Sequence, residues 1–163
     1  MSFKGPVEDR LAIRELCARY GDAVHRHDRA AYAALWAEDG VWTHPELGAQ
    51  VGREAITQTC AAAMDSFPMI HFLSMVGALE ISGEEARGAD YVSETVTDLE
   101  DRTYEVRGRY DDEYVKIRGE WIREGANVPV LGRGLIACTT VIGAPSSVRQ
   151  PLSRASLADS ASV

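Results

Sequence analysis

The sequence lacks a hydrophobic run long enough to cross a membrane. A membrane-spanning helix needs about 20 predominantly apolar residues in succession, and the apolar stretches of this 163-residue chain are all much shorter. The first ten residues, MSFKGPVEDR, also lack the apolar stretch of a secretory signal. We therefore expect a cytoplasmic protein that does not interact with membranes.

Positive charge is scarce as well. The chain has 17 Lys and Arg residues against 25 Asp and Glu residues, which gives a net charge of −8. Proteins that bind nucleic acids need clustered basic side chains to neutralise phosphates, and the sequence contains no such cluster. This composition argues against a nucleic-acid partner, and the length fits one domain of ordinary size.

Motifs for metals and cofactors are absent too. The three cysteines, Cys17, Cys60 and Cys138, are far apart and show no CxxC spacing, so neither a zinc site nor a disulfide framework is indicated. The sequence also has no P-loop, no dinucleotide-binding glycine pattern and no HExxH helix. We expect reduced thiols, no metal and no cofactor.

What the first part of the chain does contain is helical periodicity. Between residues 7 and 27, apolar side chains recur every three or four positions, which is typical of an amphipathic helix. The same spacing predicts a second helix over residues 29–37, with Asp28 as its N-cap, and a third over residues 53–66. A short strand is predicted at Val41–Thr43.

From residue 69 the pattern changes to that of long strands. Runs rich in Val, Ile, Thr, Tyr and Phe cover residues 69–81, 86–99 and 103–117, and turn residues separate them. Residues 121–130 and 135–142 are candidates for further strands. Helices followed by antiparallel strands predict an α+β domain in which three helices cover a curved sheet. The wide mouth of such a sheet is a natural ligand site.

The end of the chain has a different composition. After Ala144 the sequence reads PSSVRQPLSRASLADSASV, which is rich in Ser, Ala and Pro and poor in large apolar residues. Such segments do not bury enough apolar surface to order themselves. We therefore expect a folded domain over residues 1–144 and a mobile tail over residues 145–163.

Five segments in a fixed order resemble a known family. They read VEDRLAIRELCARY, AAYAALWAEDGVWT, VGREAI, IHFLSMVGALEISGEEARGADY and GRYDDEYVKIRGEW, and they span roughly residues 7–121. This order is similar to that of SnoaL-like proteins in the nuclear-transport-factor-2-like superfamily. The resemblance implies a cone-shaped, cystatin-like α+β barrel with a deep apolar pocket, and a dimer or trimer of identical chains.

The resemblance also implies a class of function. Superfamily members include scytalone dehydratase, hexachlorocyclohexane dehydrochlorinase, ketosteroid isomerase and polyketide cyclases, and they work without a cofactor. It therefore implies a lyase of the dehydratase or eliminating type that acts on a small hydrophobic, aromatic or polycyclic molecule. An isomerase or cyclase would use the same pocket. A non-catalytic ligand-binding or partner-subunit domain, like the small subunit of ring-hydroxylating dioxygenases, stays open as an alternative.

The resemblance points to two histidines. In related dehydratases, a histidine on the first long strand pairs with an acid on the first helix. His71 matches that histidine, whereas the position of the acid is occupied by His25, which departs from the family pattern. Asp22 lies one turn earlier and can orient His25. Imidazoles transfer protons near neutral pH, and the alternatives are a structural histidine at 71 and a solvated one at 25.

Four further residues are candidates for the pocket. Tyr20 would donate a hydrogen bond to a substrate oxygen, although a core aromatic residue at helical spacing is the alternative. The resemblance places Trp42 beside the pocket and would allow Arg107 to project into it, while an exposed charged face is the other reading of Arg107. Glu94 is a lone acid in an apolar strand, and it is either a paired carboxylate or an exposed one.

Overall fold

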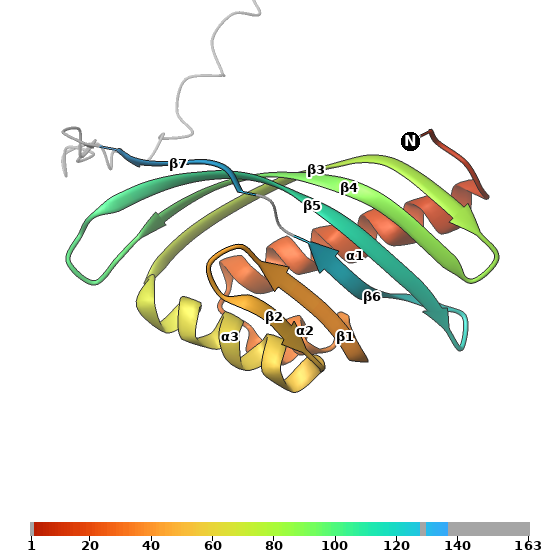
Figure 1. The fold of residues 1–163 in the computed structure, drawn as a ribbon, viewed down its shortest axis with the longest axis horizontal. Helices are drawn as coiled ribbons and strands as arrows, with labels where there is room; N and C mark the ends of the chain where they lie inside the picture. The colour runs from red at the N-terminus through yellow and green to blue at the C-terminus, as the bar shows by residue number, and fades with distance from the viewer. Residues whose placement is uncertain (1, 128–129, 137–163) are drawn as a thin grey trace, which may run out of the picture.

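The computed structural model describes residues 2–127 and 130–136, which form three helices and a curved sheet (Figure 1). The helices are α1 (Val7–His25), α2 (Arg29–Ala33) and α3 (Arg53–Ser66). The strands are β1 (Trp36–His44), β2 (Gly48–Val51), β3 (Met69–Ser82), β4 (Glu85–Thr97), β5 (Thr103–Ile117), β6 (Glu120–Asn127) and β7 (Val130–Ile136).

The sheet is mixed, strongly curved and open. Its strand order is β2-β1-β6-β5-β4-β3, and β7 pairs with the half of β5 that β6 leaves free. All neighbouring strands are antiparallel except β1 and β6, which are parallel. The helices lie on the concave side of the sheet (Figure 1). The predicted α+β class is confirmed, with a sheet that is curved like a barrel wall but does not close among the described strands.

The helix predictions are largely confirmed. The third helix has the expected bounds, and the side chain of Asp28 caps α2 by accepting a hydrogen bond from the backbone N–H of Ala31. The second helix is shorter than predicted. Trp36, which was expected on a helical face, begins β1 and pairs with Arg123 in β6. A buried tryptophan fits a helix and a strand equally well, so the spacing of apolar residues does not show that the helix has already ended before Trp36.

The three long strands are also confirmed, each within two residues of its predicted bounds. The strand β2 was missed because its side chains are mostly exposed and show no apolar alternation. Residues 137–163 lie outside the described residues, and so do the predicted domain end at 144, the tail and most of the last candidate strand.

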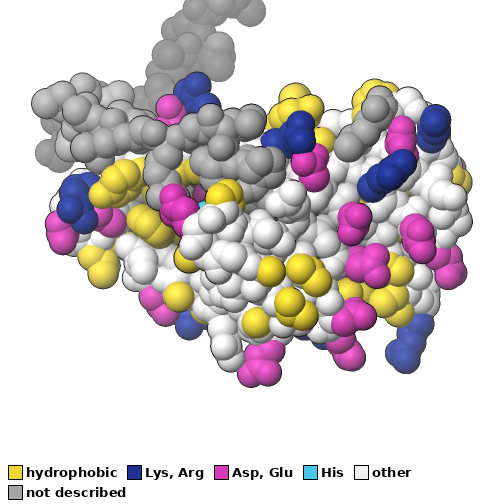
Figure 2. Space-filling view, in the orientation of Figure 1, with side chains coloured by type: hydrophobic (Ala, Val, Ile, Leu, Met, Phe, Trp, Pro, Cys, Tyr) yellow, Lys and Arg dark blue, Asp and Glu magenta, His cyan; other side chains and the backbone are white. Residues whose placement is uncertain are grey.

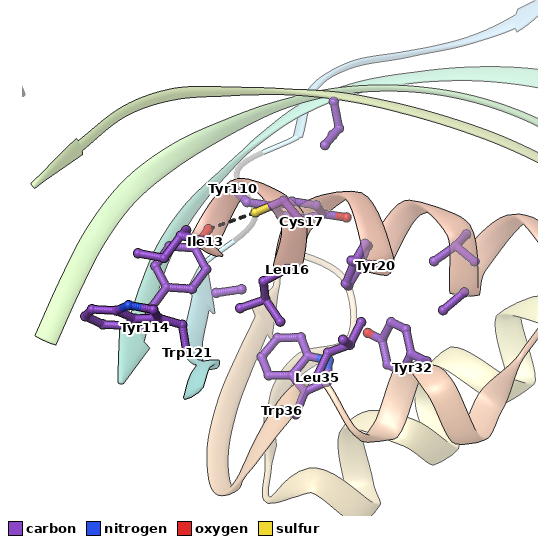
Figure 3. Close-up of a cluster of buried hydrophobic side chains, with 14 of the residues drawn as sticks. Ile13, Leu16, Cys17, Tyr20, Tyr32, Leu35, Trp36, Tyr110, Tyr114 and Trp121 are labelled. Atoms are coloured by element: carbon purple, nitrogen blue, oxygen red, sulfur yellow. Dashed lines mark hydrogen bonds between the residues drawn. The ribbon is translucent and has the colours of Figure 1, made fainter. Parts of the chain in front are cut away.

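The core lies between α1 and the inward face of β4, β5 and β6 (Figure 3). One face of α1 buries Ile13, Leu16, Cys17, Tyr20 and Val24, as the periodicity predicted. These side chains pack against aromatic residues of the other elements, which include Trp36, Tyr110, Tyr114 and Trp121. This end of the sheet is densely filled, whereas the other end of its concave face is hollow.

The surface agrees with the composition. On the face drawn in Figure 2, Lys and Arg side chains lie apart from one another among acidic ones and form no continuous basic patch. None of the helices among the described residues combines the length and the apolar character that crossing a membrane requires.

Candidate functional site

A cavity of about 590 Å³ lies between α3, the C-terminal half of α1 and the hollow part of the sheet. Its lining is mostly apolar and includes Val24, Met64, Ile70, Phe72 and Val92. Ligand sites for small organic molecules typically have volumes of about 300–1,000 Å³ and mainly apolar walls with a few polar groups. The cavity therefore has the size and lining of a small-molecule site.

Strand register places one carboxylate in the middle of the hollow face. Phe72 of β3 pairs with Glu94 of β4, and Glu94 pairs with Val106 of β5, so the three side chains form one row across the sheet. All three residues line the cavity. Because side chains alternate along a strand, Val92 and Val96 face the same way as Glu94. The sequence candidate Glu94 is thus an acid within an apolar wall.

Three tyrosines form the floor beside this carboxylate. Tyr20 and Val24 are one turn apart on α1, so both face the cavity. The ring of Tyr20 lies 5.1 Å from that of Tyr32 and 6.3 Å from that of Tyr110, measured between centroids. The phenol groups of Tyr32 and Tyr110 are in polar contact with that of Tyr20. The floor is therefore a connected group of hydroxyls.

Burial keeps these phenols protonated. It raises the pKa of Tyr20, Tyr32 and Tyr110 above the ordinary value, and the negative charge of Glu94 raises those of Tyr20 and Tyr110 further. Burial also raises the pKa of the Cys60 thiol to about 11. At neutral pH the floor offers hydrogen-bond donors, and a proton acceptor stands next to them.

The mouth of the cavity has a polar rim. On one side, His44 accepts a hydrogen bond from the backbone N–H of Glu46 (3.2 Å), and its ring lies 5.5 Å from that of Trp42. On the other side, Arg102 donates to Asp98 (2.8 Å). Burial raises the pKa of Asp98, but the hydrogen bonds that it accepts from Arg102, Glu100 and Tyr104 together outweigh this and bring the pKa down to about 2. Of the sequence candidates, Trp42 lies where it was expected, in the cavity wall.

The two histidines meet, but outside the cavity. Nε2 of His25 lies 3.4 Å from Nδ1 of His71, so the predicted pairing of these positions is present in the fold. Both side chains are exposed, however, and neither lines the cavity. Ile70 and Phe72 face inward on β3, so His71 between them faces outward. The structure therefore places His71, the candidate for proton transfer, outside the cavity.

Arg107 and Asp22 lie outside the cavity as well. Arg107 is on the outer face of β5, is exposed and forms an ion pair with Glu105 at 2.9 Å. Asp22 is exposed on α1, and the group that orients His25 is the backbone carbonyl of Gly21, 2.9 Å from Nδ1. Among the sequence candidates, the structure thus gathers Tyr20, Trp42 and Glu94 in one cavity.

Sequence reasoning missed Tyr32, Cys60 and Tyr110. The signal for Tyr110 was available, because Tyr104, Val106, Gly108 and Tyr110 alternate with charged residues along β5. The tyrosine-bearing face is the one that lines the cavity. For Tyr32 and Cys60, the helical spacing shows only that the side chains face inward. It does not separate a cavity from a filled core.

A second polar group lies behind the floor. Ligand atoms of Cys17, Asp90 and Asp112 lie within 4.8 Å of one another and are fully buried. These are metal-binding residue types, but the guanidinium of Arg123 lies 3.1 Å from Asp112 and provides a positive charge at this place. Burial raises the pKa of Asp90 to about 6. The group therefore fits an internal ion pair better than a metal site.

This combination of fold and cavity matches a known family. The family model for the SnoaL-like domain matches residues 6–123. The chain belongs to the SnoaL-like domain family. The match covers all three helices and the strands β1 to β5, and it ends within β6.

Solved structures share the fold of this SnoaL-like domain. The type 2 hexachlorocyclohexane dehydrochlorinase LinA has a TM-score of 0.74 at 20% identity, covering 81% of this chain and 91% of that chain. A candidate scytalone dehydratase from Novosphingobium aromaticivorans has a TM-score of 0.74 at 19% identity, with 78% and 87% covered.

A candidate aromatic ring hydroxylase from Novosphingobium aromaticivorans has a TM-score of 0.72 at 24% identity, and the match covers 82% of this chain and 96% of that one. No curated protein matches the sequence. At these low identities the likeness concerns the fold of the SnoaL-like domain, and its chemistry has to be argued from the cavity itself.

Proposed function

We propose that this SnoaL-like domain is a cofactor-independent lyase of the eliminating type that acts on a small hydrophobic, aromatic or polycyclic molecule. Glu94 removes a proton from a carbon atom, and Tyr20 donates a hydrogen bond to the oxygen that gains negative charge. The observation that carries this proposal is the position of the Glu94 carboxylate in the middle of the apolar cavity face, beside several protonated phenols.

The chemistry needs both kinds of group. A carboxylate placed within reach of a C–H bond can act as the general base. Phenol donors near an oxygen stabilise the charge that develops there. In an elimination, the C–H electrons form the new double bond, the bond from carbon to the leaving group breaks, and the proton passes to Glu94. An isomerase would return this proton to a different carbon atom.

The two histidines have another role in this proposal. Because His25 and His71 are exposed and do not line the cavity, we assign them to the contact between the end of α1 and β3. Proton transfer to the substrate then depends on Glu94 rather than on His71.

A generic elimination probe tests the proposal without knowledge of the natural substrate. 5-Nitrobenzisoxazole is a neutral aromatic molecule that a base opens to a coloured phenolate, by removing the C–H proton while the N–O bond breaks. We expect the protein to accelerate this reaction over free acetate, and we expect Glu94→Gln to reduce the rate by at least about 100-fold. Glu105→Gln, on the outer face of the neighbouring strand, is the matched control.

A binding domain without catalysis is the second candidate. The observation in its favour is that both histidines expected to carry the proton chemistry lie outside the cavity. In this case hydrophobic aromatic molecules would bind, but the probe would be opened no faster than in buffer, and Glu94→Gln would change neither result.

We also propose that the protein is a cytoplasmic homo-oligomer, a dimer or a trimer. Leu73, Met75 and Tyr91 are large apolar residues that remain exposed on the outer face of β3 and β4, and a second copy of the chain would cover them. Light scattering during gel filtration measures the number of chains. A monomer at micromolar concentration would contradict the proposal.

A further inference from the structure

A buried positive charge lies directly behind the phenol floor. Arg123 of β6 is 2% exposed, and its guanidinium carbon lies 4.7 Å from the centroid of the Tyr20 ring. The same carbon lies 5.9 Å from the centroid of Tyr110. Tyr20 and Tyr110 line the cavity, whereas Arg123 does not. The rings therefore separate the guanidinium from any bound molecule.

Several contacts fix this guanidinium in place. Nη2 of Arg123 lies 3.1 Å from Oδ2 of Asp112, and it donates to Sγ of Cys17 at 3.7 Å. The hydroxyl of Tyr114 donates to the same oxygen of Asp112 at 2.8 Å. The backbone N–H of Arg123 donates to the carbonyl of Leu35 at 2.9 Å. Because the side chain is held from several elements, its charge keeps a constant position relative to Tyr20.

The charge acts on the phenols in a definite direction. A guanidinium over a ring face is attracted to the ring and holds its orientation. Its positive charge favours electron density on the phenol oxygen, so it lowers the pKa of Tyr20 and of Tyr110, against the larger opposite effect of burial. A more acidic phenol is a stronger hydrogen-bond donor. In a buried site this interaction is weakly screened.

We propose that Arg123 is a positioning residue that orients Tyr20 and strengthens its hydroxyl as a donor to the substrate oxygen. This inference rests on the proposed function, because Arg123 acts only through Tyr20 and Tyr110. It also narrows the substrate class to molecules in which an oxygen atom gains negative charge in the rate-limiting step, such as a phenolate leaving group or an enolate. Substrates that lose chloride would gain little from this donor.

The test measures how the reaction depends on the leaving group. In a series of substituted benzisoxazoles, the phenolate that forms becomes a progressively poorer leaving group as its parent phenol becomes less acidic. A strong donor to the oxygen makes the rate less sensitive to this change. We therefore expect the plot of log kcat against the pKa of the leaving phenol to be shallow for the native protein and steeper for Tyr20→Phe.

Arg123 is removed together with its partner. The paired variant Arg123→Met with Asp112→Asn removes both members of the buried ion pair. We expect it to show a steeper plot than the native protein and a kcat about 10-fold lower for the poorest leaving groups, with KM within two-fold. If Arg123 made only a structural contact, its loss would lower kcat by the same factor for every benzisoxazole in the series. A slope equal to the native one would overturn the proposal.

A second variant covers the case in which the paired variant does not fold. Arg123→Lys keeps the positive charge but loses the planar guanidinium, and we expect its slope to stay near the native value. A slope as steep as that of Tyr20→Phe would contradict a role for the charge. The proposed function fails separately, since in that case Glu94→Gln and Tyr20→Phe would leave the probe reaction unchanged.

Discussion

The imidazole of His25 accepts a hydrogen bond from the backbone N–H of Phe72, and the two nitrogen atoms are 3.2 Å apart. The other ring nitrogen, Nδ1, lies 2.9 Å from the carbonyl oxygen of Gly21, which can only accept a hydrogen bond. His25 therefore donates through Nδ1 and accepts through Nε2. It connects the last turn of α1 to β3, next to a side chain that forms part of the cavity wall.

This connection predicts different costs for the two histidines. We expect His25→Ala to lower the free energy of unfolding by about 1 kcal/mol, because the contacts to Gly21 and Phe72 are lost at an exposed site where water partly replaces them. His71→Ala is expected to change it by less than about 0.5 kcal/mol. Urea denaturation followed by circular dichroism measures both values. If His71→Ala lowered the free energy of unfolding more than His25→Ala does, His71 rather than His25 would be the histidine that stabilises the contact between α1 and β3.

Asp90 gives a prediction about pH. Burial raises its pKa from 3.8 to about 6, so the folded protein binds this proton more tightly than the unfolded chain does. The resulting stabilisation is fully present below pH 3.8 and is lost as the pH rises through about 6. Asp90→Asn should therefore stabilise the protein at pH 7.5 by about 2 kcal/mol and should have little effect near pH 3.5.

Thermal unfolding at several pH values measures this difference. The exposed residue Asp39 provides the control, because Asp39→Asn removes the same charge without a change in burial. If Asp90→Asn destabilised the protein equally at pH 3.5 and pH 7.5, Asp90 would be ionised at both pH values as a partner of Arg123, which would contradict its raised pKa.

Most of the fold could be predicted because two periodicities are strong in this sequence. The spacing in α1 and α3 and the long β-branched and aromatic runs of β3, β4 and β5 each specify one element. Predictions failed where the pattern fits two structures or shows none. Trp36 satisfies a helical face and a buried strand equally well, and the exposed strand β2 has no apolar side to detect.

The site was harder to predict because the decisive question was which face of a strand points inward. The run from Met69 to Val76 is almost continuously apolar, so it does not show whether His71 or Phe72 faces the cavity. On β5 the alternation is clear, but the resemblance allowed Arg107 to project into the pocket, so it did not decide between the two faces. Arg123 lies beyond the segments that resemble the family, so the resemblance gives no role for it.

Tyr20 gives a prediction about catalysis. Tyr20→Phe removes the hydroxyl of a residue that lines the cavity but keeps the ring that packs on Phe72, with 5.4 Å between the ring centroids. We expect kcat for 5-nitrobenzisoxazole to fall by about 10²–10³-fold while the protein keeps its fold, because one donor to the developing oxyanion is lost. Tyr91→Phe, on the exposed outer face of β4, is the matched control. Equal rates for both variants would exclude Tyr20 as a donor.

Cys60 reports on the cavity directly, because its thiol lies in the wall and burial raises its pKa to about 11. Only the thiolate reacts with iodoacetamide, so at pH 8 we expect alkylation of Cys60 to be roughly 100-fold slower than that of a free cysteine. The rate should still rise tenfold per pH unit between pH 8 and pH 10, since the thiolate fraction grows in this proportion. Peptide mass spectrometry separates Cys60 from the other cysteines. An aromatic ligand bound in the cavity should slow the alkylation of Cys60 further. Fast alkylation at pH 8 that such ligands do not slow would mean that Cys60 is open to solvent.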